Sequence, residues 1–239
     1  MATFTFLAPA AAPPSGPMPA LDRWLAQYLD LGRALAEGRL GQEAWREAMD
    51  RHFPALDLEA LKARIGFAAR LAALPHLDFR GRGEAFRPLA VDAGPPRPGP
   101  EPPRRVITKL AWVRPGGSIP PHAHLNMVST FLVLSGAFRV RQFEKVAEGP
   151  ADMVLRPAMD EVQRPGAWST VTDGRRNVHW LTALEEGSCL FTTKIIRLRD
   201  GAPYAGRIHL DLRAGADRPE GELRVPKLAP WEADALYAP

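Results

Sequence analysis

Between residues 105 and 200 the chain consists of short apolar or alternating runs that end at turn residues. Ser129–Gly136 is an apolar run that ends in glycine, and Ala137–Phe143 alternates apolar with polar residues. A period of two residues is typical of a strand with one buried face. Roughly seven such strands with regular turns indicate an antiparallel jelly roll or small barrel. We therefore predict a mainly β fold built around this stretch.

The composition divides the rest of the chain into four further segments. Residues 1–19 are rich in alanine and proline and are predicted to be flexible. Residues 20–75 show helical spacing, and residues 76–104 form a connector rich in proline and glycine. After the barrel at 105–200, residues 201–239 are expected to form a C-terminal arm along the surface.

The helical segment predicts three helices, at Leu21–Glu37, Gln42–Phe53 and Asp57–Leu74. Each has an apolar stripe, and glycine or proline follows each of them. These faces must be buried against each other, against the barrel or against a second subunit. We favour packing on the barrel, and a homodimer is an arrangement that would also bury them.

Composition limits the classes of function. The 239 residues carry a net charge of +4, and the arginines are scattered rather than grouped with aromatic residues, so nucleic-acid binding is not expected. No apolar run reaches the roughly 18 residues of a membrane span. A single cysteine excludes an internal disulfide framework and makes a cytoplasmic protein the default expectation. The N-terminus lacks the basic region of a signal peptide.

Two histidines, His122 and His124, are separated by one residue and follow two consecutive prolines. In an extended segment both imidazoles point to the same face, and the prolines restrict the backbone before them. A third histidine, His179, lies in another strand-like run. Three neutral imidazoles inside a barrel can hold one divalent metal and leave coordination positions open. We predict these three as metal ligands, and His209 ranks second to His179.

These residues resemble the motifs of the cupin superfamily. Gly116 is followed after five residues by His-x-His and later by Gly136, and His179 stands where the second cupin motif supplies its histidine. The resemblance covers about residues 105–195 and implies a cupin-type barrel. The usual cupin glutamate is missing, and Ser129 stands at its expected position.

A three-histidine site without the carboxylate is similar to that of the thiol dioxygenases, and most similar to the cysteamine dioxygenase and plant cysteine oxidase group. The match to that group consists of Ile119, Pro120, His122, His124, Met127, Leu134 and Gly136, then Asn177, His179 and Cys189. Arg176 replaces a glycine of the group's pattern. The resemblance implies substrate contacts for Met127 and Ser129, and a catalytic role for Tyr204 in a Pro-Tyr segment that closes the active site.

Two further substrate contacts come from the residues themselves. Asn177 has the same strand parity as His179, so its amide can face the cavity and contact substrate, or it can be a turn residue that follows Asp173-Gly174. Arg114 ends the strand predicted from Val106, and a guanidinium is suited to binding a substrate carboxylate.

The resemblance implies a non-haem iron(II) dioxygenase that oxidises a small thiol, such as cysteamine or cysteine, to its sulfinate with O2. Zinc, nickel and copper also suit imidazole ligands. Two alternatives stay open. The first is a cupin metalloenzyme of another class, such as an isomerase, a lyase or a carbon-oxidising dioxygenase. The second is a non-enzymatic cupin that binds a small ligand.

Overall fold

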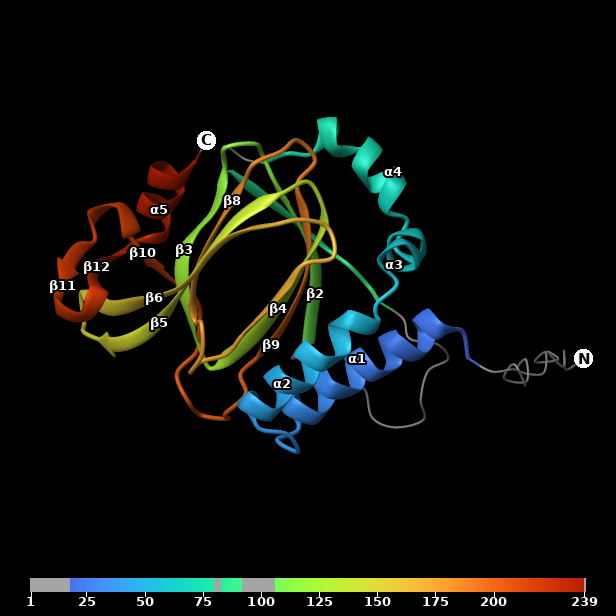
Figure 1. Ribbon diagram of the computed structural model, residues 1–239, viewed down its shortest axis with the longest axis horizontal. Helices are drawn as coiled ribbons and strands as arrows, with labels where there is room; N and C mark the ends of the chain where they lie inside the picture. Colours follow the sequence, from blue (N-terminus) through green and yellow to red (C-terminus); the bar gives the residue numbers. More distant parts are fainter. Residues whose placement is uncertain (1–17, 80–82, 92–105, 239) are drawn as a thin grey trace, which may run out of the picture.

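The computed structural model describes residues 18–79, 83–91 and 106–238, and two antiparallel sheets form its centre (Figure 1). The first sheet has the order β1-β2-β9-β4-β7, with bounds Glu84–Pro88, Val106–Val113, Cys189–Ile196, Met127–Ser135 and Trp168–Val171. The second has the order β10-β3-β8-β5-β6-β12-β11, with bounds Ala205–Leu210, Ser118–Leu125, Val178–Ala183, Phe138–Glu148, Asp152–Gln163, Glu222–Leu228 and Ala216–Arg218.

The strands β2 to β9 have the order of a jelly roll, because β2-β9-β4-β7 in one sheet face β3-β8-β5-β6 in the other. Apolar side chains from both sheets meet between them, among them Phe131, Val133, Phe138, Val140 and Leu190. The predicted mainly β fold, an antiparallel jelly-roll barrel with an N-terminal helical segment, is confirmed.

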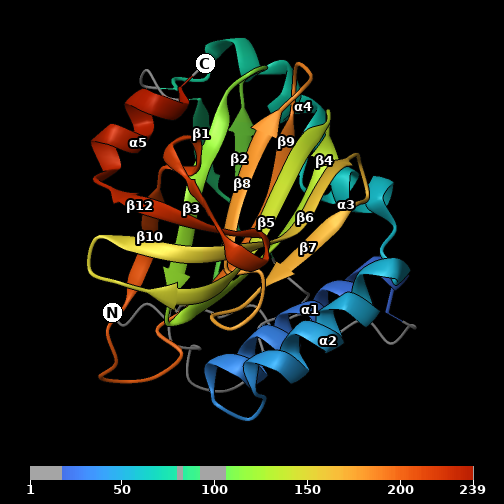
Figure 2. The same cartoon turned by 60° about the vertical axis from the view of Figure 1, so that its left-hand side comes forward.

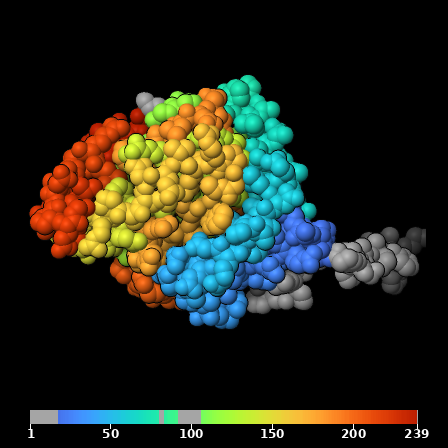
Figure 3. All heavy atoms as spheres, viewed as in Figure 1, coloured from blue at the N-terminus to red at the C-terminus, as the bar shows by residue number. Residues whose placement is uncertain are grey.

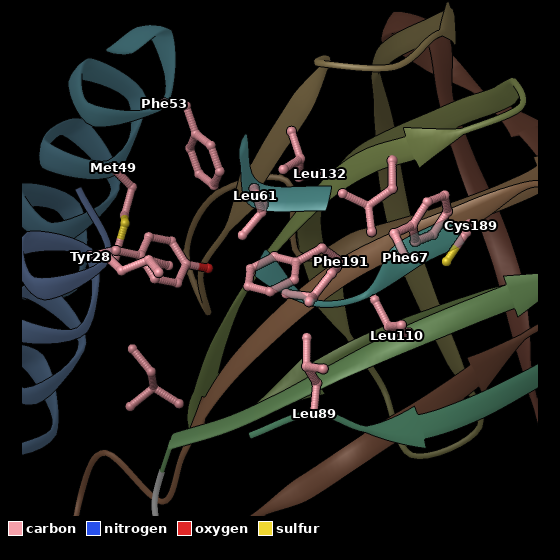
Figure 4. Packing of buried hydrophobic residues seen from close by; sticks show 14 of the residues in the cluster. Tyr28, Met49, Phe53, Leu61, Phe67, Leu89, Leu110, Leu132, Cys189 and Phe191 are labelled. Atoms are coloured by element: carbon pink, nitrogen blue, oxygen red, sulfur yellow. The ribbon is translucent and has the colours of Figure 1, made fainter. Parts of the chain in front are cut away.

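The helical segment covers the outer face of the five-stranded sheet (Figures 1 and 3). It contains α1, α2, α3 and α4, with bounds Ala20–Ala36, Gln42–His52, Leu58–Arg64 and Phe67–Ala72, and short 3-10 turns at Phe53–Ala55 and Leu74–His76. Its apolar side chains pack against the sheet residues Leu132 and Phe191 (Figure 4). The Tyr28 hydroxyl also lies 2.7 Å from the Thr130 hydroxyl on β4.

The third predicted helix is interrupted. It was expected to run from Asp57 to Leu74, but α3 ends at Arg64 and α4 begins at Phe67. Gly66 between them has φ +61°, a left-handed conformation that glycine adopts without steric cost and that breaks the helical hydrogen-bond ladder.

Both segments that flank the predicted barrel contribute strands. Within the predicted connector, β1 pairs with β2, and the rest of that segment lies partly outside the described residues. The predicted C-terminal arm holds β10, β11 and β12, the 3-10 turns Leu212–Ala214 and Pro219–Gly221, and α5 at Pro230–Tyr237. Here β10 pairs with β3, and β12 pairs with β6, so these residues extend the second sheet (Figure 2). Most of the predicted N-terminal flexible segment lies outside the described residues.

Within the described ranges, the longest helix has 17 residues, and none of the helices is long and apolar enough to cross a membrane.

Candidate metal centre

Three histidines meet on the inner face of the barrel. His122 and His124 lie on β3, and His179 lies on β8 directly opposite His122. One ring nitrogen from each residue lies within 4.8 Å of the corresponding atoms of the other two. The ring centroids are 4.3 to 5.0 Å apart, and all three side chains are buried. The structure thus brings the three predicted ligands together.

Backbone carbonyl groups fix the orientation of all three rings. The Nδ1 atom of His122 lies 2.7 Å from the Pro120 oxygen, that of His124 lies 2.6 Å from the Gly206 oxygen, and that of His179 lies 3.1 Å from the Asn177 oxygen. A carbonyl only accepts, so each Nδ1 carries the proton and donates it. Each Nε2 is therefore left with its lone pair free, which is the tautomer that binds a metal.

The irregular pairing of β3 explains why these carbonyls are available. The register between β3 and β8 shifts between Ile119 and His122, where two prolines have no N–H to donate. The register between β3 and β10 shifts between Ala205 and Ile208. Gly206 lies inside this second irregularity, and its oxygen accepts from His124.

All three histidines are held in the neutral form. Burial, with a smaller contribution from the nearby Lys194, lowers the pKa of His179 to about 3. Burial also lowers the pKa of His122 and of His124 well below its usual range, with added repulsion from His179 on His122 and from Lys194 on His124. Neutral imidazole is the ligating form, so no proton has to be displaced at pH 7.

The donor set fits a divalent transition metal. The buried Nε2 of His124 has no hydrogen-bond partner within the described part of the chain, which is costly unless a ligand occupies the position. Two nitrogens bonded to one metal at roughly 2.1 Å are at most about 4.2 Å apart. A cluster spanning 4.8 Å therefore has to contract by roughly half an ångström to hold an ion in common.

A cavity of about 30 Å³ adjoins the cluster, with space for roughly two water molecules. Its polar lining includes His122, His179, Ser129, Thr192, Lys194 and Arg207. Among the described residues that line it there is no carboxylate. Ser129 therefore faces the centre from the wall where a cupin glutamate was expected. Met127 has the same strand parity as Ser129, and it is fully buried but does not line the cavity.

The Asn177 side chain forms its hydrogen bonds with backbone atoms rather than with groups in the cavity. Its Oδ1 accepts from the His124 N–H at 2.6 Å, and its Nδ2 donates to the oxygens of His124 at 3.0 Å and Asp173 at 2.9 Å. Both amide hydrogens are therefore used within the protein. These bonds fix the β3 segment that carries His124, which gives Asn177 a positioning role, and its contact with a substrate stays a prediction.

Arg114 lies away from the centre. It is exposed beyond the end of β2, its guanidinium is 4.4 Å from the ring centroid of Phe79, and it lines a surface hollow beside α4 instead of the histidine cavity. The strand ends one residue earlier, at Val113, so the Arg114 side chain leaves the barrel wall, and its role in substrate binding stays a prediction.

Tyr204 lies just before β10, and 37% of its surface is exposed. Its ring lies 5.2 Å from the Arg197 guanidinium, and it is not among the residues that line the cavity. Its catalytic role stays a prediction. His209 is a near neighbour of the cluster, with its ring 6.1 Å from that of His122, but its nitrogens are not part of the three-histidine group.

Two polar residues that face the barrel interior were missed. Lys194 on β9 lies directly opposite Ser129, and Gln142 on β5 lies opposite His179 with neither amide atom hydrogen-bonded within the described residues. Strand parity contains the signal for Lys194. Within Cys189–Ile196, Lys194 has the same strand parity as Leu190 and Thr192, and all three residues line the cavity on the inner face.

No protein-family profile matches the chain, and no curated protein sequence matches it. Solved structures to which the chain is similar include KdgF from Halomonas sp., with 19% identity, a TM-score of 0.34 and coverage of 49% of this chain and 82% of that one. An oxalate oxidase in complex with glycolate has 19% identity, a TM-score of 0.35 and coverage of 50% and 54%, so the match spans about half of each chain. A cupin superfamily protein from Desulfitobacterium hafniense has 13% identity, a TM-score of 0.34 and coverage of 50% and 84%. The likeness is limited to about half of this chain and assigns no activity to it.

Proposed function

We propose that this chain is a cupin-like, non-haem iron(II) enzyme that oxidises a small thiol to its sulfinate with O2. The balanced reaction is RS⁻ + O2 → RSO2⁻, in which sulfur loses four electrons, the two oxygen atoms gain them, and two S–O bonds replace the O–O bond. The observation that carries the proposal is a cluster of three neutral histidines with no carboxylate among the described residues of the adjoining cavity.

Charge is the physical reason for preferring a thiolate. Three neutral ligands leave both positive charges of the ion uncompensated, whereas a glutamate would cancel one of them. An anionic ligand therefore binds more favourably to this site than to one with a glutamate, and thiolate is a soft anion that binds transition metals well. When bound, iron(II) would lower the pKa of the substrate thiol and provide the site at which O2 is activated.

The chain's own residues orient the reactants and exclude water. His122, His124 and His179 would hold the ion through Nε2, and backbone oxygens keep their rings in place. Phe86 and Phe131 form apolar walls of the same cavity, and its small volume keeps bulk water out. Ser129 leaves space where a fourth protein ligand would stand in a four-ligand cupin.

The test measures oxygen uptake by the iron-loaded protein with cysteamine, cysteine, 3-mercaptopropionate and a peptide with an N-terminal cysteine. We expect uptake with at least one thiol, and one sulfinate formed for each O2 consumed. His124→Ala should lose both the metal and the uptake. His209→Ala is the matched control, because it removes a neighbouring buried imidazole outside the cluster and should keep the metal.

Two results would contradict the proposal. If no thiol supports uptake above the His124→Ala background, thiol oxidation is wrong, and a cupin metalloenzyme of another class or a ligand-binding cupin takes its place. If His209→Ala loses the metal as completely as His124→Ala does, the ligand set is wrong.

A further inference from the structure

The wall of the histidine cavity formed by β4 and β9 carries a cation that the proposed chemistry does not use. Lys194 lines this cavity and is directly opposite Ser129 on the neighbouring strand. Leu190 and Thr192, on the same face of β9, line the cavity too, so the lysine side chain belongs to its interior.

The charge of Lys194 is not balanced by the protein. Its ammonium has no hydrogen bond or ion pair within the described part of the chain. The other cation of the cavity, Arg207, is already paired, since its two guanidinium nitrogens lie 2.5 and 3.1 Å from the carboxylate oxygens of Glu84. An ammonium largely withdrawn from water without a partner is costly, so the lysine either loses its proton or is stabilised by a ligand that supplies the counter-charge.

The electrostatic surroundings agree with this. Burial, together with smaller repulsion from Arg207 and Lys109, lowers the pKa of Lys194 to about 7, against the opposing attraction of Glu84. An anion beside the ammonium would reverse this shift and keep the lysine charged.

A hydroxyl stands next to the same position. The Oγ1 of Thr192 is buried without a hydrogen-bond partner within the described residues, and Thr192 also lines the cavity. It lies two residues before Lys194 on the same face of β9, which places a neutral donor and a cationic donor side by side. An ammonium and a hydroxyl together satisfy the two oxygens of a carboxylate.

We propose that the substrate carries a carboxylate in addition to the thiol, and that Lys194 and Thr192 bind this carboxylate while the sulfur faces the three histidines. This inference rests on the proposed function and narrows it, because it selects small mercapto acids over cysteamine, whose ammonium would lie against Lys194. The small cavity favours a short carbon chain between the two groups.

The test measures binding, so that it does not depend on turnover. Anaerobic calorimetric titrations of the iron(II)-loaded protein would compare 3-mercaptopropionate with 1-propanethiol, which lacks the carboxylate, and with propionate, which lacks the thiol. We expect Lys194→Met to lower the affinity for 3-mercaptopropionate by about 10- to 100-fold, because the charge-assisted contact is lost. The affinity for 1-propanethiol should stay within about twofold of the wild-type value. Lys194→Arg should retain most of the affinity, and propionate should bind weakly and only when the cation is present.

Matched controls separate this effect from damage to the fold. Lys62→Met removes a lysine charge on the surface of α3 and should change neither affinity. Lys194→Met should keep the metal and unfold at a temperature at least as high as the wild type, because methionine buries no charge. The inference is overturned if Lys194→Met leaves the affinity for 3-mercaptopropionate unchanged, or lowers the affinities for 3-mercaptopropionate and 1-propanethiol equally.

The two proposals fail in different ways. Lys194-dependent binding of 3-mercaptopropionate or propionate without oxygen uptake would keep the carboxylate site and reject thiol oxidation. Oxygen uptake that is as fast with cysteamine as with 3-mercaptopropionate, and insensitive to Lys194→Met, would keep thiol oxidation and reject the carboxylate site.

Discussion

Replacing Asn177 with alanine removes the side chain that joins β3 to the segment leading into β8. The amide makes three hydrogen bonds, two of them to the backbone of His124, and it is 2% exposed. A net loss of about 1 kcal/mol for each bond gives roughly 3 kcal/mol of unfolding free energy. For a chain of this length, that corresponds to a fall in Tm of roughly 6–12 °C.

Metal affinity should fall as well. Residues that orient a metal ligand typically contribute about 10- to 100-fold in affinity. Urea unfolding of the metal-free protein measures the first effect, and competition with a chromophoric chelator measures the second. Gln163→Ala is the matched control, because it removes a buried amide with one hydrogen bond, from its Nε2 to the Ser169 hydroxyl at 3.2 Å. It should cost about 1 kcal/mol and leave metal affinity unchanged. Equal metal affinities for Asn177→Ala and Gln163→Ala would refute the positioning role.

Ser129→Glu should supply a fourth ligand, so that the protein keeps its metal but loses thiol-dependent oxygen uptake; uptake at the wild-type rate would contradict the charge argument. The pKa of His179 is lowered from 6.5 to about 3 in the folded protein, so its contribution to stability is complete above pH 6.5 and is lost as pH falls from 6.5 towards 3. Urea unfolding of the metal-free protein at a series of pH values should show this loss, and a flat profile would count against burial of a neutral imidazole. Gly136→Ala should destabilise the protein by roughly 1–3 kcal/mol, because φ is +68° and a Cβ would lie 2.7 Å from the Ser188 Cα. Gly174→Ala, where a Cβ would meet no atom within 4 Å, should be nearly neutral in the same assay.

The three-histidine cluster was predictable because its signal is local. Two residues at positions i and i+2 of a strand share a face whatever the strand pairs with, so His122 and His124 required no knowledge of the fold. His179 needed only the expectation of a second barrel strand on the same wall. The alternating runs between residues 105 and 200 indicated the barrel for the same reason.

Pairings between distant segments were not predictable from local pattern. Glu84–Pro88 leads into a proline-rich stretch, and Ala205–Leu210 follows a turn with one glycine and one proline, so neither stands out as a strand until its partner is known. The side-chain bonds of Asn177 were hidden likewise, because they reach a backbone segment 53 residues away. Lys194 was overlooked for another reason. A charged residue in an apolar run is usually assigned to solvent, whereas here it lies inside the barrel.

The carbonyl that orients His124 comes from Gly206 on β10, far along the chain from the histidines themselves. During synthesis on the ribosome, a nascent chain that ends before β10 already contains His122, His124 and His179 but lacks this carbonyl and the strand that flanks β3. Its His124 ring can rotate and exchange tautomers. The metal centre is therefore fully organised only after β10 has paired with β3.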